Sequence, residues 1–252
     1  MGVAQKNEAL RDASAQRCIF CGISNRAPSV EHVVPAGLGR HISIELPRGA
    51  MCEPCNNYLG RQVDEALVHL FEVQLIRGFH RVPDHQGRRI KEVPLRNGNI
   101  SFPDDMPIRV DVHGEGHVEK RKGSVRVKTI SKRRRSGDQW RRTTRALMKM
   151  GLGLICYGSG HDVALDPEWD RLRAVIAGES YEGYLLIGEF DIFKTPHLNA
   201  SLSSDLPGMS LAARLSFGGL DLIADLYPQP ANDEVRAWAK KEKYHVMDIA
   251  PR

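Results

Sequence analysis

The chain has 252 residues, of which 41% are hydrophobic and 27% are charged, and its formal net charge is +5. This composition is that of a globular protein with a sizeable core, arranged as one large domain or two small ones. No stretch approaches the ~20 consecutive apolar residues of a membrane-spanning helix, which argues against a membrane protein. The polar N-terminal segment has no apolar signal core, so we expect a cytoplasmic protein.

The positive charge is concentrated in the middle third of the sequence. Residues 77–145 carry 19 basic and 8 acidic side chains, a net charge of +11, whereas residues 1–76 carry −1 and residues 146–252 carry −5. The segment 120–145 alone has twelve Lys or Arg among its 26 residues. Such a density favours a polyanionic partner such as nucleic acid, DNA or RNA; the alternative is a solvated basic face without a partner.

The first block of the chain, residues 15–77, holds four of the five cysteines and ends in a predicted helix. Apolar residues recur at helical spacing from Asn56 onward, Pro54 suits the first turn, and Gly78 is the predicted terminator. Upstream of this helix, the segments EHVVP and ISIEL predict a β-hairpin.

The second block, residues 78–252, mixes helix and strand patterns and is predicted to be a larger basic α+β domain. A helix is predicted at about 139–157, anchored by Trp140. A second helix is predicted to begin with Asp166 as its N-cap and Pro167 at its first position. NDEVRAWAKKEKY predicts a last helix. The segments that predict strands are IRVDVHG, SVRVKTI, YEGYLLIGEFDIF and LAARLSFGGLDLIADLY.

The four N-terminal cysteines form two CxxC pairs, Cys18 with Cys21 and Cys52 with Cys55, separated by 30 residues. Four thiolates complete the tetrahedral set of a structural zinc site. A pair of redox motifs is disfavoured, because neither pair lies between a strand and a helix in the manner of thioredoxin. Zinc would supply the folding free energy that this short, polar segment lacks. Cys156 lies on the apolar face of a predicted helix, and we expect it in the core.

Between the two cysteine pairs, the segment EHVVP places an acidic residue beside a histidine. Neighbouring side chains of an extended strand point to opposite faces, so Glu31 and His32 cannot form a simple acid–base pair. They suit two groups that serve one centre from different sides. The alternative is a zinc ribbon in which both are ordinary strand residues.

The order CxxC, EHVVPAGLG, CxxCNN resembles the HNH endonucleases, the zinc-clamped subgroup of the ββα-metal nucleases, over roughly residues 15–65. The resemblance implies an α+β protein in which residues 15–77 form a ββα-metal module with structural zinc. It implies an enzyme that hydrolyses phosphodiester bonds in DNA with a catalytic divalent ion. The sequence departs from the family in two ways: Glu31 stands where many members have Asp, and the middle Asn of the family has no clear match.

The resemblance also implies roles for three residues. His32 matches the general base that activates the attacking water, and Glu31 matches the acidic ligand of the catalytic ion. Asn56, directly after the last cysteine, matches the third residue of the motif, which binds the same ion. Its neighbour Asn57 is a rival for that role. Oxygen ligands suit Mg²⁺ or Mn²⁺ better than zinc.

Other polar residues of this block receive weaker assignments. Arg40 and Arg61 are candidate phosphate contacts, His41 is expected at the surface, and Asp64 is expected to cap or pair near its helix. Two rival functions stay open: a non-catalytic zinc-ribbon protein that binds DNA or RNA, and a nuclease that acts on RNA.

Overall fold

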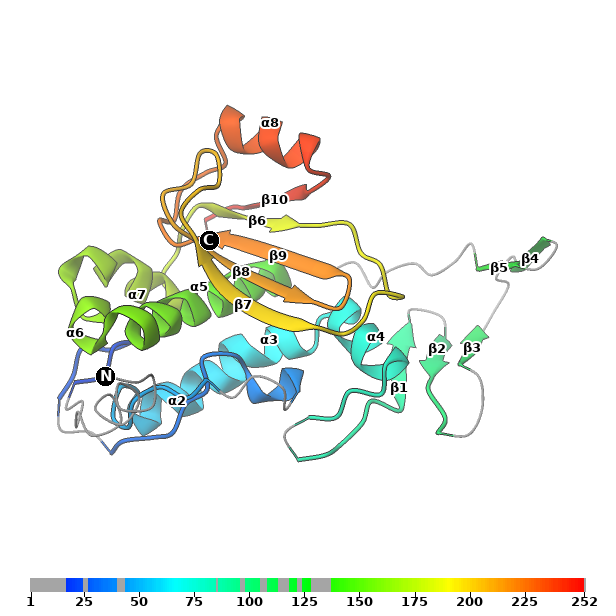
Figure 1. Ribbon diagram of the computed structural model, residues 1–252, viewed down its shortest axis with the longest axis horizontal. Coiled ribbons are helices and arrows are strands. Elements are labelled where there is room, and N and C mark those ends of the chain that lie inside the picture. The colour runs from blue at the N-terminus through cyan, green and yellow to red at the C-terminus, as the bar shows by residue number, and fades with distance from the viewer. Residues whose placement is uncertain are drawn as a thin grey trace, which may run out of the picture.

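The protein is an α+β structure of helices and antiparallel sheets, which confirms the predicted fold class (Figure 1). None of the helices in the described part of the chain is long and apolar enough to cross a membrane. The computed structural model describes residues 17–24, 27–39, 44–84, 86–95, 98–104, 108–112, 118–121, 124–127 and 137–251.

The predicted N-terminal hairpin is present as a single antiparallel bridge, between His32 and Glu45, rather than as two regular strands. Two backbone hydrogen bonds of 2.8 Å flank the bridge, and the Glu31 carbonyl accepts one of them. Beyond Leu46 the ladder ends at Pro47, because proline has no N–H to continue it.

The prediction of one continuous helix from residue 56 to Gly78 is wrong. Leu70 is buried and has extended backbone angles, so the helix stops before it and starts again after it. Gly78 lies inside the last segment, where the Phe102 ring covers it so closely that no Cβ would fit. The observed segments are α2 (Glu53–Leu59), the π-helical turn η2 (Gly60–Asp64), α3 (Glu65–Val68) and α4 (Phe71–Phe79).

Two small antiparallel sheets follow α4. The first contains β1 (Glu92–Leu95), β2 (Gly98–Ser101) and β3 (Arg109–Val112), and its buried side chains pack on α4. The second is the ribbon of β4 (Val118–Arg121) and β5 (Ser124–Val127). The strands predicted from IRVDVHG and SVRVKTI are therefore confirmed.

The main sheet has five antiparallel strands in the order β10-β6-β9-β8-β7. The segments YEGYLLIGEFDIF and LAARLSFGGLDLIADLY form three of these strands, as predicted, whereas β7 and β10 carry no strand prediction. Gly218 takes a left-handed φ of 58° in the two-residue turn that joins β8 to β9. The strands are β6 (Gly183–Ile187), β7 (Leu198–Ser203), β8 (Ala212–Phe217), β9 (Leu220–Asp225) and β10 (His245–Ile249).

Helices cover both faces of this sheet. The long helix α5 (Gly137–Ser159) lies between the sheet and the N-terminal helices, and α8 (Asp233–Lys241) covers the other face (Figure 1). Alternation along the strands separates the two cores: Leu185 packs towards α5, whereas Tyr184 and Leu186 pack towards α8.

Short helices follow α5, namely α6 (His161–Ala164), η3 (Pro167–Trp169) and α7 (Asp170–Ala177). The predicted cap is confirmed, since the Asp166 carboxylate accepts a 2.8 Å hydrogen bond from the Glu168 N–H.

One continuous cluster of buried side chains reaches from Cys18 through α5 to Ile249. Cys156 belongs to this core, as predicted, and Trp140 packs against it. The N-terminal cysteines and the main sheet are therefore parts of one hydrophobic interior, with α5 between them.

Gly151 of α5 packs so closely against the main sheet and Leu226 that we expect no larger residue to be tolerated there. A Cβ at Gly151 would lie 2.6 Å from Leu226 Cδ2 and 3.1 Å from Ala213 Cβ. We expect Gly151→Val to lower the free energy of unfolding by about 1–3 kcal/mol through overpacking, measured by urea unfolding followed by circular dichroism.

Gly158 provides the matched control in the same helix. Apart from its chain neighbours and the backbone of its own helix, no described atom lies within 4 Å of a Cβ placed at Gly158. Gly158→Ala is therefore expected to raise stability by up to about 1 kcal/mol through helix propensity. If Gly151→Val were as stable as the native protein, the close packing of α5 on the sheet would be refuted.

Candidate active site

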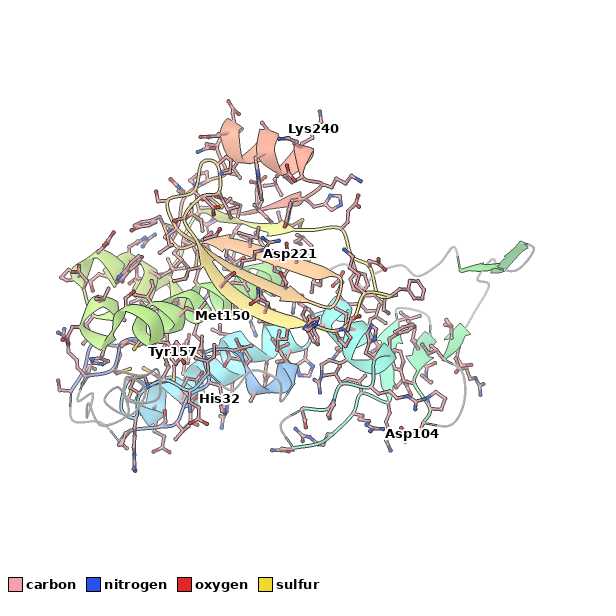
Figure 2. The ribbon with its side chains drawn as sticks, viewed as in Figure 1. His32, Asp104, Met150, Tyr157, Asp221 and Lys240 are labelled. Atoms are coloured by element: carbon pink, nitrogen blue, oxygen red, sulfur yellow. The ribbon has the colours of Figure 1, made fainter. Side chains whose placement is uncertain are left out.

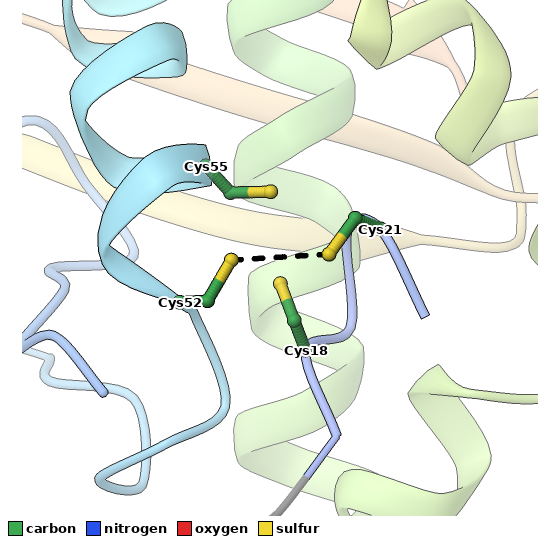
Figure 3. Close-up of side chains that lie close together, drawn as sticks. All are labelled: Cys18, Cys21, Cys52 and Cys55. Atoms are coloured by element: carbon green, nitrogen blue, oxygen red, sulfur yellow. Dashed lines mark hydrogen bonds between the residues drawn. The ribbon is translucent and has the colours of Figure 1, made fainter. Parts of the chain in front are cut away.

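The side chains of the four N-terminal cysteines come together at one place, although 30 residues separate Cys21 from Cys52 (Figure 3). Their sulfur atoms all lie within 4.8 Å of one another, and Cys21 Sγ and Cys52 Sγ are 3.8 Å apart. Zinc–sulfur bonds of about 2.3 Å in a tetrahedron place the sulfur atoms about 3.8 Å apart. The cluster therefore fits a structural zinc ion.

Local geometry places each pair of thiols. Cys18 and Cys21 lie on a tight turn that Gly22 closes with a left-handed φ of 68° and a hydrogen bond to the Cys18 carbonyl. Cys52 is the N-cap of α2, and Cys55 lies in its first turn. The neighbouring Cys55 thiol lowers the pKa of Cys18 well below its usual value, which favours a thiolate within the cluster.

A cleft of about 630 Å³ opens beside α2 and η2, and it is lined by Glu31, His32 and Asn56. All three residues to which the resemblance assigns roles thus lie in one cleft. Figure 2 shows His32 beside the N-terminal helices, on the side of α5 opposite the main sheet. Asn57 is exposed and does not line the cleft, which favours Asn56 over its neighbour.

The π-helical turn brings a fourth polar residue to this cleft. A π-turn holds one more residue than an α-turn, because its hydrogen bonds run from i to i+5. Residues four apart already lie close to one face of a helix, and the wider π-turn keeps Asp64 in line with Asn56, so Asn56, Gly60 and Asp64 all face the cleft. Asn56 also joins α2 to the neighbouring segment, since its amide nitrogen donates to the Val30 carbonyl at 3.2 Å.

Glu31 and Asp64 share one lysine that comes from α5. Lys149 Nζ lies 2.5 Å from Glu31 Oε1 and 2.5 Å from Asp64 Oδ2. Lys149 is 2% exposed and Glu31 is 7% exposed, so this group of charges is shielded from water. Asp64 is predicted to cap or pair near its own helix; it does form an ion pair, but with Lys149 of the distant helix α5. The sequence signal for Lys149 was a single lysine inside the apolar run ALMKMGLGL.

The two carboxylates and one ammonium carry a net charge of −1 in a buried place. Burial raises the pKa values of Glu31 and Asp64, and the Lys149 charge only partly opposes this. Burial also acts to lower the pKa of Lys149, but the two carboxylates outweigh it and raise that pKa. A second positive charge beside the carboxylates would therefore stabilise their ionised forms.

Two atoms at the cleft lack the hydrogen bonds that buried polar groups normally make. Asp64 Oδ1 and His32 Nδ1 are buried and have no hydrogen-bond partner in the described part of the chain. Together with the net negative charge, the Asp64 Oδ1 atom fits a divalent cation held by oxygen ligands. Asp64 is thus a candidate ligand that the sequence motif did not identify.

Of the two candidate phosphate contacts, Arg40 and Arg61, the structure describes only Arg61. Arg61 is exposed and does not line the cleft, and Arg40 and His41 lie outside the described residues. So do residues 122, 123 and 128–136 of the basic segment.

The arginines at the end of the basic segment make contacts within the protein that stabilise the fold. Arg145 is buried and donates to the Ile176 carbonyl, and Arg142 pairs with Asp138 at 2.9 Å. Arg141 donates to the Ala250 carbonyl. These arginines therefore have partners within the chain and are not a free cationic surface.

Comparison with known proteins identifies the N-terminal segment. Residues 18–72 match the family model described as HNH endonuclease, a stretch that includes both CxxC pairs, Glu31, His32, Asn56 and Asp64. The chain therefore carries an HNH domain at its N-terminal end, and the resemblance noted from the motifs is confirmed. Searches of the curated proteins and of the solved structures return no significant match.

Proposed function

We propose that this protein is a metal-dependent endonuclease that hydrolyses phosphodiester bonds in DNA. The observation that carries the proposal is the cleft of the HNH domain, where Glu31, His32 and Asn56 meet beside a buried carboxylate pair of net negative charge. The domain supplies the class of reaction, and the cleft supplies residues of the types that this reaction uses.

The residues around the cleft have the chemistry to hold a divalent ion. Glu31 and Asp64 would contribute carboxylate oxygens and Asn56 its amide oxygen, a set that suits Mg²⁺ or Mn²⁺. Asp64 Oδ1 is the strongest candidate ligand atom, because it is buried and has no hydrogen-bond partner among the described residues. When bound, such an ion supplies charge stabilisation at the phosphate and at the leaving oxygen.

His32 is the proposed general base. Its imidazole lines the cleft, and a neutral imidazole can accept the proton of an attacking water. Lys149 would act only indirectly, by fixing one oxygen of Glu31 and one of Asp64. The zinc cluster would act further away, by holding the turn and the helix that carry these residues.

Plasmid cleavage tests the proposal. We expect the purified protein to cut in Mg²⁺ or Mn²⁺ and not in EDTA. His32→Ala is expected to slow cleavage by about 10²–10⁴-fold, the usual contribution of a general base. His245→Ala, at an exposed histidine of β10, is the matched control and should cut at the native rate.

The same assay separates the rival functions. Cutting in EDTA, or native cleavage by His32→Ala, would refute the proposed chemistry. A protein that shifts the plasmid on a gel without cutting it would be a zinc-dependent nucleic-acid binder. Matched RNA and DNA substrates decide which nucleic acid is cut.

A further inference from the structure

One wall of the cleft lies outside the residues that match the HNH family. The match ends at residue 72, and the segment that follows it lines the cleft with Arg77, Arg88 and Arg89. The carboxylates Glu31 and Asp64 line the same cleft. The cleft thus combines an acidic group suited to a cation with a basic group suited to an anion.

Arg77 is the unusual member of this wall. It lies in the last turn of α4 and is only 4% exposed, yet it lines the cleft. Its Nε has no hydrogen-bond partner within the described residues. Burial lowers the pKa of Arg77, although Asp84 partly opposes that effect. A buried guanidinium with an unsatisfied N–H is costly, so a partner that arrives from outside would account for it.

The nearby carboxylate of Asp84 is already engaged. Asp84 Oδ1 accepts hydrogen bonds of 2.9 Å from the backbone N–H groups of Gln86 and Arg88, and Asp84 Oδ2 accepts one of 2.8 Å from Arg88 Nε. Among the described residues, no ion pair joins Asp84 to Arg77. Asp84 therefore shapes the turn that presents Arg88 at the cleft and leaves Arg77 available to a ligand.

The basic wall continues beyond the cleft. A second hollow of about 310 Å³ shares Arg88 and Arg89 with the cleft and adds Arg81 and Lys91. Its one acidic lining residue is Asp104, which Figure 2 labels beside the first small sheet. Asp104 Oδ1 lies 3.3 Å from a terminal guanidinium nitrogen of Arg89. Cations therefore line a path from the cleft to the neighbouring surface.

We propose that Arg77, Arg88 and Arg89 form a subsite for a backbone phosphate of DNA, and that the bound strand leaves the cleft over Arg81 and Lys91. This inference rests on the proposed function and assigns the direction in which the substrate lies. Guanidinium groups bind phosphate through paired N–H donors, which is the interaction that the Arg77 Nε lacks. Arg77 would make the buried contact, and the exposed arginines would add charge attraction.

Binding to DNA without cleavage tests the subsite. In a His32→Ala background, the affinity for a short DNA duplex is measured over a series of salt concentrations. We expect Arg77→Gln to weaken binding about tenfold and Arg89→Gln to weaken it less. Each variant should reduce the slope of log affinity against log salt by about 0.9, the value for one lost phosphate contact.

Arg236→Gln is the matched control, because it removes the same charge from α8, where Arg236 pairs with Asp248. It should change neither the affinity nor the salt slope. Since Arg77 is buried, circular dichroism checks that its variant is folded, and Arg89, which is half exposed, gives a test independent of the core.

The outcomes distinguish this subsite from the proposed function. If Arg77→Gln and Arg89→Gln keep the native affinity and salt slope while the native protein cuts DNA, the subsite is refuted and the nuclease stands. If the His32→Ala protein binds no DNA and the native protein cuts none, the proposed function fails and the subsite fails with it.

Discussion

Replacing Cys52 with serine is expected to unfold the N-terminal domain. Cys52 contributes one of four sulfur atoms that lie within 4.8 Å of one another, and three thiolates hold zinc far less tightly than four. Structural zinc contributes about 10–16 kcal/mol of binding free energy in small zinc domains, which is comparable to the total stability of a typical protein. Among the described residues between the two cysteine pairs, β-pairing is limited to isolated bridges.

Zinc content by mass spectrometry and limited proteolysis measure this effect. The native protein should hold one zinc ion per chain and resist cleavage within residues 18–72. Cys156→Ala is the matched control, because it removes a buried cysteine from α5 without touching the cluster, and it should retain zinc. A Cys52→Ser protein with full zinc content and native protease resistance would refute the zinc clamp.

Replacing Lys149 with methionine is expected to lower the free energy of unfolding by about 3–5 kcal/mol. Methionine fills a similar volume but leaves Glu31 and Asp64 as two buried carboxylates without a counter-ion. Removing one partner of a buried ion pair has a cost of this size, because the remaining charge stays out of water. Urea unfolding of the zinc-loaded protein without added Mg²⁺ or Mn²⁺ measures the loss without a contribution from the catalytic ion.

A triple variant separates charge from packing. Lys149→Met combined with Glu31→Gln and Asp64→Asn removes all three charges at nearly constant volume, so most of the lost stability should return. The triple variant should still fail to cut DNA, since it lacks the carboxylates. If Lys149→Met alone were as stable as the native protein, the three charges would not form the buried group described above.

The parts of the fold that the sequence predicted correctly are those with local signals. Asp166 followed by Pro167 defines a helix start within three residues, and the segment LAARLSFGGLDLIADLY carries the strand pattern of β8 and β9. The CxxC pairs are also local, and only one metal geometry satisfies both of them at once. Such signals need no knowledge of the rest of the chain.

The parts that the sequence did not predict depend on distant contacts. β7 alternates apolar and polar residues, and Leu198, Ala200 and Leu202 pack against the core. It is nevertheless a short edge strand, and its Asn and Ala residues have low strand propensity. The break at Leu70 lies within a helical apolar pattern. In the candidate site, the family motif predicted Glu31, His32 and Asn56, whereas Lys149 pairs with Glu31 across 118 residues of sequence.

This long separation sets the order in which the protein can be completed on the ribosome. The zinc ligands have all been synthesised by Cys55, so the clamp can close on a short nascent chain. Lys149 follows Asp64 by 85 residues, and α5 must emerge and dock before the two carboxylates gain their counter-ion. A prematurely ended chain would therefore hold zinc yet have an incomplete cleft, and cleavage would await synthesis of the long helix.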